Sequence, residues 1–283
     1  SFAFKFLILI NIFSFAAIIF SFAACNLEQE IDLELPVYEA QLVVESYVQV
    51  GEPFTLLLTK SAAYFADFPE FNEDVVETFL EQGATVNISV NGKTYELENE
   101  LGINPFTQKI HNYISREIVP NNYTDTFTLR IITGDGATIT ASTQLLPVVP
   151  TDSMVVEFSE TADTLARVLS YYTDDETQDN WYRRMVHLGT LDSLEQDFAL
   201  TDEFVDEGTL VFGSGYDYKV GDTLFSTFIH IEEAYHDFLE SIRGAVDANG
   251  NPFGQPSSVL SNVSGTADPI GIFTGLAIER KAV

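Results

Sequence analysis

Short runs of alternating apolar and polar residues are the feature that most restricts how this chain can fold. Residues 86–90 alternate in this way, and residues 93–97 do so again after Asn91-Gly92. A two-residue hairpin turn of this kind needs positive φ at both of its central residues, which Asn and Gly tolerate best. The pattern therefore predicts a β-hairpin over residues 86–97, and a period of two favours strands over helices.

Further strand patterns fill the first half of the chain. They are bounded by turn residues, as in Gly51-Glu52-Pro53 and in residues 133–136, which separate neighbouring apolar runs. We therefore expect an Ig-like or transthyretin-like β-sandwich over residues 36–147. Besides the hairpin, its predicted strands are residues 42–48, 54–59, 126–132 and 137–143.

The segment Pro147-Val148-Val149-Pro150 interrupts the strand pattern. Two prolines so close together are incompatible with a central strand, because proline cannot donate a ladder hydrogen bond. This predicts a domain junction, followed by a second β-rich domain over residues 151–283. Its predicted strands are residues 154–158, 165–172, 181–188, 224–231 and 270–278.

One amphipathic helix is expected in this second domain. Tyr235, Phe238, Leu239 and Ile242 follow one another at helical spacing and would form one apolar stripe. Gly244 follows Arg243 in a position typical of a helix C-cap. The stripe is interpreted as a core-facing surface, and the fold class as mostly β with this single helix.

The charge balance of the chain excludes one class of partner. There are 13 Lys and Arg residues against 43 Asp and Glu residues, which gives a formal net charge of −30. Such a surface repels the phosphates of nucleic acids and of anionic lipids, so we expect no nucleic-acid partner. Solubility outside the cytoplasm explains the acidity, and recruitment of Ca²⁺ or of a cationic ligand is the alternative.

The N-terminal segment has the character of a secretory signal. Lys5 precedes a long apolar stretch that ends in Phe22-Ala23-Ala24-Cys25, and small residues at this point are typical of a cleavage site. Cys25 is the sole cysteine, so no intramolecular disulfide can form. We expect residues 1–24 to be a lipoprotein signal peptide and Cys25 to carry a lipid anchor. The alternative is an uncleaved transmembrane anchor, because the apolar stretch is nearly long enough to span a bilayer.

Residues 25–35 are polar and acidic, and we interpret them as a lipidated tether ahead of the first strand. An acidic run directly after a lipidated cysteine resembles the export signal that sends Bacteroidota lipoproteins to the outer face of the outer membrane. The expected location is therefore the outer membrane, lipid-anchored and facing the cell surface. The periplasmic face is the alternative.

Five segments along the chain carry a resemblance to a known family. In order they are residues 30–45, 179–183, 221–224, 235–239 and 271–275. Their order and spacing resemble the Bacteroidota lipoproteins called domain of unknown function 4249, over roughly residues 30–283. Members are typically encoded beside TonB-dependent outer-membrane receptors, so the resemblance implies an accessory role at such a transporter. It supplies no catalytic residue.

A search for catalytic chemistry finds no convincing constellation. His230 and His236 are six residues apart, whereas two zinc ligands on one helical face need a spacing of four. Ser214 lies in Gly-Ser-Gly, which lacks the Gly-x-Ser-x-Gly frame of a nucleophile elbow. We therefore expect no enzyme, no catalytic residue and no cofactor.

Two segments are weaker candidates for binding. The loop with Asp174, Asp175, Glu176 and Asp179 gathers hard oxygen ligands of the kind that Ca²⁺ requires, but it lacks the register of an EF-hand, and a solvated acidic loop is the alternative. A long segment after the second predicted strand carries several bulky aromatic residues, and long loops with such side chains often mark a binding surface. The alternative is that these rings cap the edge of the sandwich. The partner-binding candidates are Tyr64, Phe65, Phe68 and Phe71.

Three functions are compatible with these features. The first is a non-enzymatic surface lipoprotein that docks on, or supplies ligand to, a TonB-dependent receptor. The second is an adhesin-like structural β-sandwich that acts without a transporter. The third is a secreted hydrolase whose site is not visible in one sequence. Fold and family alone do not decide between them.

Overall fold

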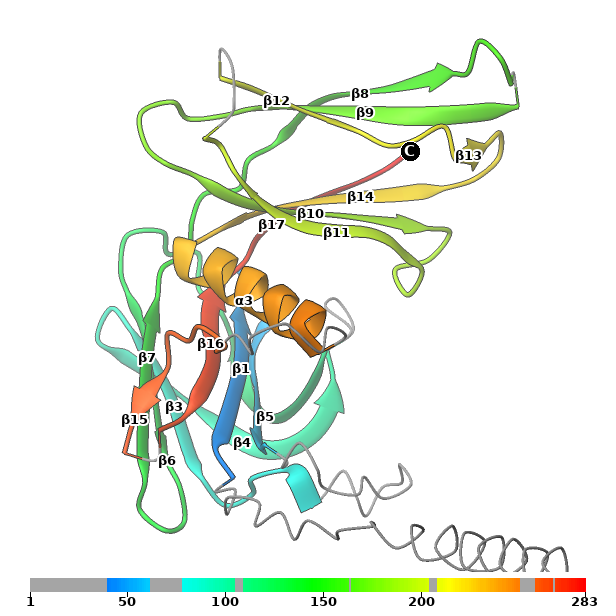
Figure 1. Ribbon diagram of the computed structural model, residues 1–283. Coiled ribbons are helices and arrows are strands. Elements are labelled where there is room, and N and C mark those ends of the chain that lie inside the picture. Colours follow the sequence, from blue (N-terminus) through cyan, green and yellow to red (C-terminus); the bar gives the residue numbers. More distant parts are fainter. Residues whose placement is uncertain are drawn as a thin grey trace, which may run out of the picture. The chain divides into compact units, whose positions relative to one another are not determined.

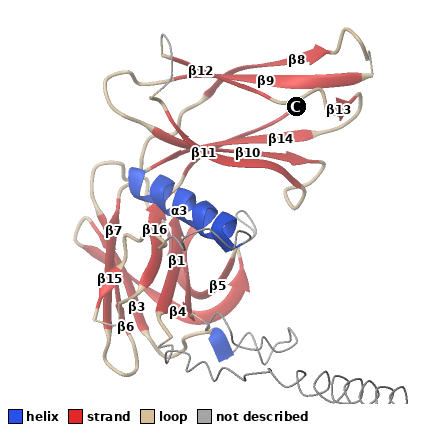
Figure 2. Ribbon diagram, viewed as in Figure 1, coloured by secondary structure: helices blue, strands red, loops and turns tan. Residues whose placement is uncertain are grey.

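A computed structural model describes residues 40–61, 78–104, 109–162, 164–203, 208–249, 258–266 and 268–283. The described part is mostly β with one long helix, which confirms the predicted fold class (Figures 1 and 2). The signal peptide, Cys25, the tether and the aromatic candidates Tyr64, Phe65, Phe68 and Phe71 lie outside these residues.

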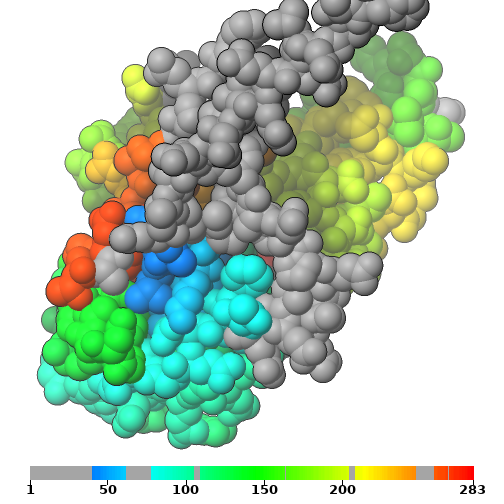
Figure 3. Space-filling model, turned by 60° about the horizontal axis from the view of Figure 1, so that its bottom comes forward, coloured from blue at the N-terminus to red at the C-terminus, as the bar shows by residue number. Residues whose placement is uncertain are grey.

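Within the described residues, the first half of the chain and two strands from near its end form one continuous nine-stranded sheet. Its order is β15-β7-β6-β3-β4-β5-β2-β1-β16. The two edges of the sheet approach each other. The edge strand β16 contacts β7 near the opposite edge, and the backbone N–H of Gly275 donates to Thr143 Oγ1 at 2.9 Å. In Figure 3 the blue, cyan and green residues of the first half of the chain lie in adjoining areas of the surface. The strands are β1 (Leu42–Val48), β2 (Pro53–Lys60), β3 (Thr85–Val90), β4 (Lys93–Ile103), β5 (Ile110–Ile118), β6 (Phe127–Ile132), β7 (Thr138–Thr143), β15 (Ser264–Gly265) and β16 (Ile270–Gly275).

The expected hairpin is confirmed between β3 and β4. Asn91 and Gly92 take φ values of 49° and 74°, as a two-residue turn of this type requires. Alternate residues of β3 and its neighbours then point inward, which explains why a period of two in the sequence becomes one apolar core. That core includes Phe54, whose ring centroid lies 4.8 Å from the ring centroid of Tyr95.

Strand β5 was not predicted, because its buried face carries polar residues. Asn112 is only 1% exposed, yet its side chain is hydrogen-bonded throughout. Its Oδ1 accepts from the backbone N–H of Leu58 at 2.8 Å, and its Nδ2 donates to the carbonyl oxygens of Leu58 and Glu81 at 3.0 Å. A buried amide is tolerated when its donors and acceptors are paired in this way, and such a strand lacks the apolar alternation that reveals strands in a sequence.

The second half of the chain forms two four-stranded sheets. One has the order β11-β10-β14-β17, and in the other β9 is flanked by β12, β13 and β8. Aromatic rings fill the space between them, where Phe228 stacks on Tyr172 at 4.0 Å and on Tyr182 at 4.8 Å between ring centroids. The strands are β8 (Thr151–Phe158), β9 (Leu165–Thr173), β10 (Trp181–Leu188), β11 (Leu194–Thr201), β12 (Thr209–Gly213), β13 (Tyr218–Lys219), β14 (Leu224–Ile231) and β17 (Ala277–Ala282).

The last part of the chain returns to the first sheet before it ends in the second region. β16 pairs in parallel with β1, and after Leu276 the chain continues directly into β17. The single strand expected at residues 270–278 is therefore two strands in two different sheets. Both β15 and β16 lie within residues 151–283, for which a second domain is predicted, yet both pair with the sheet of residues 42–143. Gly271 explains the close pairing, because a Cβ there would lie 1.9 Å from the carbonyl oxygen of Val44.

The predicted helix is α3 (Glu233–Asn249). Tyr235 is buried, and Phe238 and Leu239 pack beside it, as the apolar stripe predicted. The expected end at Gly244 is wrong, because the helix continues through it to Asn249, and Ile242 is 37% exposed. In the described part of the chain, no helix combines the length and the apolar character that a membrane crossing requires.

Candidate functional site

The two faces of strand β10 lie in different environments, one between the two four-stranded sheets and the other on the opposite side of its own sheet. Successive side chains of a strand point to opposite faces, so the adjacent side chains of Arg183 and Arg184 lie on opposite faces of the sheet. Arg184 is 1% exposed and points between the two four-stranded sheets, within reach of Phe198 and Phe212. Arg183 lies on the opposite face together with Met185.

The pairing of the neighbouring strands places further residues on that opposite face. Met185 is paired with Thr227 of β14, and Thr227 in turn is paired with Arg280 of β17. The next row contains Arg183, Ile229 and Ile278. Three strands therefore present a single surface that combines cationic and apolar side chains.

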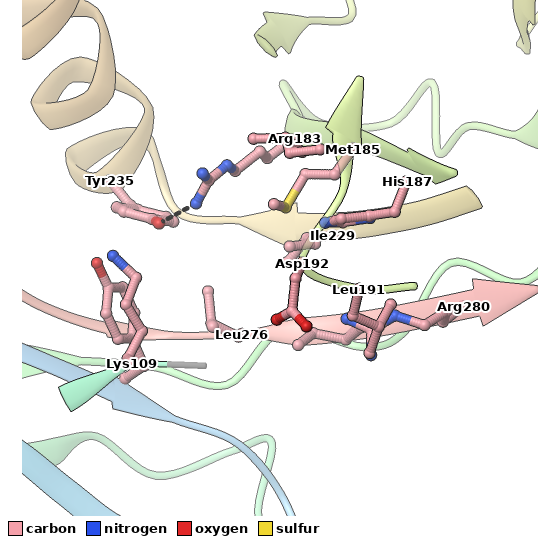
Figure 4. Close-up of a pocket in the computed structure, with 13 residues that line it drawn as sticks. Lys109, Arg183, Met185, His187, Leu191, Asp192, Ile229, Tyr235, Leu276 and Arg280 are labelled. Atoms are coloured by element: carbon pink, nitrogen blue, oxygen red, sulfur yellow. Dashed lines mark hydrogen bonds between the residues drawn. The ribbon is translucent and has the colours of Figure 1, made fainter. Parts of the chain in front are cut away.

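A cavity of about 340 Å³ lies over this surface. In Figure 4, His187 and Arg280 lie toward one end of it and Lys109 and Tyr235 toward the other, with Ile229 between them. Its lining is contributed by β1, β10, β11, β14, α3 and β17, by the residue before β5, by the segment between β10 and β11, and by the residue between β16 and β17. The lining residues are Tyr47, Lys109, Arg183, Met185, His187, Leu191, Asp192, Leu194, Ile229, Tyr235, Leu276, Ile278 and Arg280.

One end of the cavity is built from two tyrosines and the charged groups that hold them. The rings of Tyr47 and Tyr235 meet edge to face, with centroids 5.8 Å apart. Arg183 Nη1 donates to the Tyr235 hydroxyl at 2.6 Å (Figure 4). The hydroxyl of Tyr47 donates to Glu45 at 2.7 Å, and Lys109 Nζ pairs with the same carboxylate at 2.8 Å.

Both cations at this end are neutralised by carboxylates. Arg183 forms a two-pronged ion pair with Asp197, with Nε–Oδ1 and Nη2–Oδ2 distances of 2.7 and 2.6 Å. Burial alone would lower the pKa of Arg183, but the bond and charge of Asp197 raise it above its ordinary value. Burial also raises the pKa of Tyr47 and of Tyr235, so both phenols stay protonated and can donate hydrogen bonds.

The other end holds Arg280 and His187. Arg280 is half-buried, and its Nε donates to Thr227 Oγ1 at 2.9 Å. Within the described residues, no carboxylate lies within ion-pair distance of Arg280. His187 is 5% exposed, and its Nδ1 has no hydrogen-bond partner among the described residues. Burial lowers its pKa, and the charge of Arg280 lowers it further, so this imidazole is neutral at pH 7.

The acidic loop proposed as a weak calcium candidate does not converge on one point. Asp174 is buried and accepts from the hydroxyl of Tyr182 and from Asn180 Nδ2. Asp175, Glu176 and Asp179 are exposed instead. Asp175 Oδ1 accepts from the Thr177 hydroxyl at 2.6 Å. Over the whole described part of the chain, no three His, Cys, Asp or Glu residues are grouped so that they could hold a metal ion.

The two histidines compared with a zinc motif also have separate settings. His230 lies on β14, as predicted, and its Nδ1 is 2.9 Å from the carbonyl oxygen of Pro147. His236 lies on α3. Nothing brings the two rings to a common point.

None of the cavity residues is among the site residues predicted from the sequence. They come from segments far apart in the chain, and only the fold assembles them. One sequence signal was nevertheless present, because Arg183, Arg184 and His187 interrupt the apolar residues of the strand at residues 181–188. An arginine in that position needs either a partner or a ligand.

The fold and the cavity together define a mostly β protein with a recess of small-molecule size. Comparison with known families then places it. A family model described as Domain of unknown function (DUF4249) matches residues 28–282, so the chain belongs to that family, as the resemblance implied. A search of curated proteins finds no match.

Proposed function

We propose that this protein is a non-enzymatic Bacteroidota lipoprotein that captures a small ligand at the cell surface and supplies it to a TonB-dependent outer-membrane transporter. The observation that carries the proposal is the cavity over the face of β10, β14 and β17. Ligand sites are typically concave recesses of about 300–1,000 Å³ with a mostly apolar lining and a few placed polar groups. At about 340 Å³, with apolar side chains between two polar ends, this cavity has those properties.

The N-terminal sequence supports the location. Phe22-Ala23-Ala24-Cys25 suits lipidation at Cys25 after cleavage of residues 1–24. The tether of residues 25–35 would span at most about 40 Å when extended. A protein held at that distance stays beside the membrane, where it can reach a receptor.

The net charge of −30 fits the same proposal. It disfavours adsorption of the folded part to anionic head groups, so the lipid anchor rather than the protein surface would hold it at the membrane. The aromatic candidates Tyr64, Phe65, Phe68 and Phe71 stay a prediction for the receptor-binding surface.

The test is a pull-down of the tagged, full-length protein from outer membranes in mild detergent, followed by mass spectrometry. We expect one TonB-dependent receptor to be recovered in stoichiometric amount. A variant with Phe65→Ser and Phe68→Ser should reduce that recovery. A matched control is Val155→Ser with Val156→Ser on β8, where both side chains are about two-fifths exposed, at 41% and 44%.

The result is interpretable when lipidation and surface exposure are verified in the same cells. A Cys25→Ser variant should lose the lipid label and leave the membrane fraction. If the lipidated, surface-exposed protein recovers no outer-membrane receptor, the transporter role is contradicted, and the adhesin and hydrolase alternatives replace it.

A further inference from the structure

Arg280 occupies an unusual position for a cation in so acidic a chain. The sequence offers 43 carboxylates for 13 Lys and Arg residues. Nevertheless, Arg280 is half-buried at the cavity and has no carboxylate partner within the described residues. Because burying an unpaired charge is costly, such a group is expected to serve a purpose other than stability.

The geometry of Arg280 leaves its outer nitrogens available. Its Nε is held by Thr227 Oγ1 at 2.9 Å, which fixes the plane of the guanidinium. No hydrogen bond within the described residues uses Nη1 or Nη2. A guanidinium held in this way presents a fork of N–H donors that suits a carboxylate or another planar oxyanion.

The remaining charges of the cavity do not compensate Arg280. Arg183 and Lys109 already pair with Asp197 and Glu45 at the other end. Among the described residues, Asp192 is the one carboxylate of the lining, and it is exposed and makes no ion pair with Arg280. The local charge therefore favours an anion at the Arg280 end.

The other lining residues indicate that the ligand also has an apolar part. Met185, Ile229, Leu276 and Ile278 give the cavity an apolar wall. His187 adds a neutral ring beside Arg280, with an Nδ1 that has no partner within the described residues. Burying apolar ligand surface contributes roughly 25 cal/mol per Å², so the wall favours an apolar body and the arginine an anionic head.

We infer that this cavity binds an amphipathic organic anion, with its carboxylate or sulfonate on Arg280 and its apolar body against Met185, Ile229 and Leu276. The inference rests on the proposed function, since it names the class of ligand that the protein would capture. The recognising chemistry is a charged oxyanion joined to a compact apolar group.

Two fluorescent probes of the same frame test it. 8-Anilino-1-naphthalenesulfonate carries an anionic head, and N-phenyl-1-naphthylamine is its neutral counterpart. We expect the purified full-length protein to bind the sulfonate with 1:1 stoichiometry and more tightly than the amine. Arg280→Met should weaken sulfonate binding roughly tenfold or more, which is the usual effect of losing a charge-assisted bond, and should leave binding of the amine nearly unchanged.

Lys281→Met is the matched control. It removes the same charge from the next residue of β17, where the side chain is 52% exposed and pairs with Glu279. We expect it to leave both affinities unchanged, and Arg280→Lys to recover part of the sulfonate affinity. Asp192→Asn should strengthen sulfonate binding modestly by removing a like charge. Near-UV circular dichroism of each variant verifies that the probe reports a folded cavity rather than loosened packing.

The outcomes separate this inference from the proposed function. If the amine binds at the cavity as well as the sulfonate does, and Arg280→Met changes neither, the cavity captures neutral ligands and the anion inference is overturned. If neither probe binds, ligand capture at this cavity is overturned as well. Sulfonate binding that Lys281→Met weakens as much as Arg280→Met would show attraction by surface charge and would also contradict the assignment of Arg280.

Discussion

The two β regions of the molecule treat buried polar groups in opposite ways. In the nine-stranded sheet, Asn112 is buried and each of its side-chain polar atoms is hydrogen-bonded to the backbone. Between the two four-stranded sheets, Arg184 is just as buried. There it has one hydrogen bond, from Nη1 to Gln196 at 2.8 Å, and its Nε has no partner in the described part of the chain.

The apolar cores of the two regions also differ, in how continuously their buried side chains pack together. Counting only described residues, the first sheet encloses one large cluster of buried side chains, whereas the second region and its junction with α3 hold three smaller ones. Ser170 Oγ and Ser226 Oγ also lack partners there, again within the described residues. In the first region the corresponding atom is Gln49 Oε1, so buried polar atoms without a partner among the described residues are more numerous in the second region than in the first. The candidate site lies on the outer face of this second region.

Replacement of Asn112 should have the largest effect. Asn112→Ala leaves the backbone N–H of Leu58 without its partner. It also removes one of the two donors to each of the carbonyl oxygens of Leu58 and Glu81, which keep the Glu81 N–H and the Tyr113 hydroxyl. Since a buried group left unpaired costs about 1–3 kcal/mol, and the lost side chain also leaves a cavity in the core, the free energy of unfolding should fall by about 3 kcal/mol. Urea denaturation measures it. Asn99→Ala on neighbouring β4 is the control, because Asn99 is exposed and makes a single bond, to the Asn112 carbonyl oxygen. Equal losses for the two variants would contradict the structural role of Asn112.

Replacing the neighbouring arginines of β10 one at a time should change the free energy of unfolding by at most an intermediate amount, and the two changes can be compared directly. Arg183→Met leaves Asp197 and Tyr235 without their partner, so we expect the free energy of unfolding to fall by about 1–3 kcal/mol. Arg184→Met removes a cation whose pKa burial lowers. Replacing a buried, poorly compensated charge by an apolar side chain is often neutral or stabilising, so stability should stay level or rise by about 1 kcal/mol.

Both variants are measured by the same denaturation experiment, which removes differences in method. They change identical side chains at adjacent positions and differ only in the face of the strand. A loss for Arg184→Met as large as that for Arg183→Met would show that the interior guanidinium is well compensated. The contrast between the two regions would then fail.

Much of the fold could be predicted from the sequence, and the reason is local. The Asn91-Gly92 turn and the alternation around it determine β3 and β4 without help from the rest of the chain. The same reasoning found α3, but it ended the helix at Gly244, because packing against the rest of the fold can override the unfavourable helix propensity of glycine. It missed β5 and β11, whose partly polar faces hide the period of two, and also the short strands β12, β13 and β15.

The candidate site could not be predicted in the same way. Tyr47 and Tyr235 lie almost 190 residues apart in the chain and meet only because β16 pairs with β1 and leads directly into β17. Arg280 lies opposite Thr227 through the same long-range pairing. No local pattern encodes such register. The acidic loop at residues 174–179 was easier to notice in the sequence, because its ligand-like residues are consecutive.

Glu232 offers the smallest effect and tests the connection between β7 and α3. Its Oε1 accepts from the backbone N–H of Gln144 at 3.1 Å, and its Oε2 accepts from the Thr143 hydroxyl. Burial raises the pKa of Glu232 above its ordinary value of 4.5, although the two hydrogen bonds oppose the rise. The folded state therefore binds the proton more tightly than the unfolded state, so this group makes the free energy of unfolding fall as pH rises above about 4.5.

Glu232→Gln should remove that contribution, because glutamine does not titrate. Denaturation of both proteins between about pH 4 and 7, a range that spans the ordinary carboxyl pKa, gives the difference in stability at each pH. We expect this difference to move in favour of the variant as pH rises. Glu233→Gln, at the exposed next residue, controls for the loss of one negative charge from an acidic protein. If Glu232→Gln and the unmodified protein change in parallel over this range, folding does not raise the pKa of Glu232, and its bonds from Thr143 and Gln144 then offset the burial of the carboxylate in full.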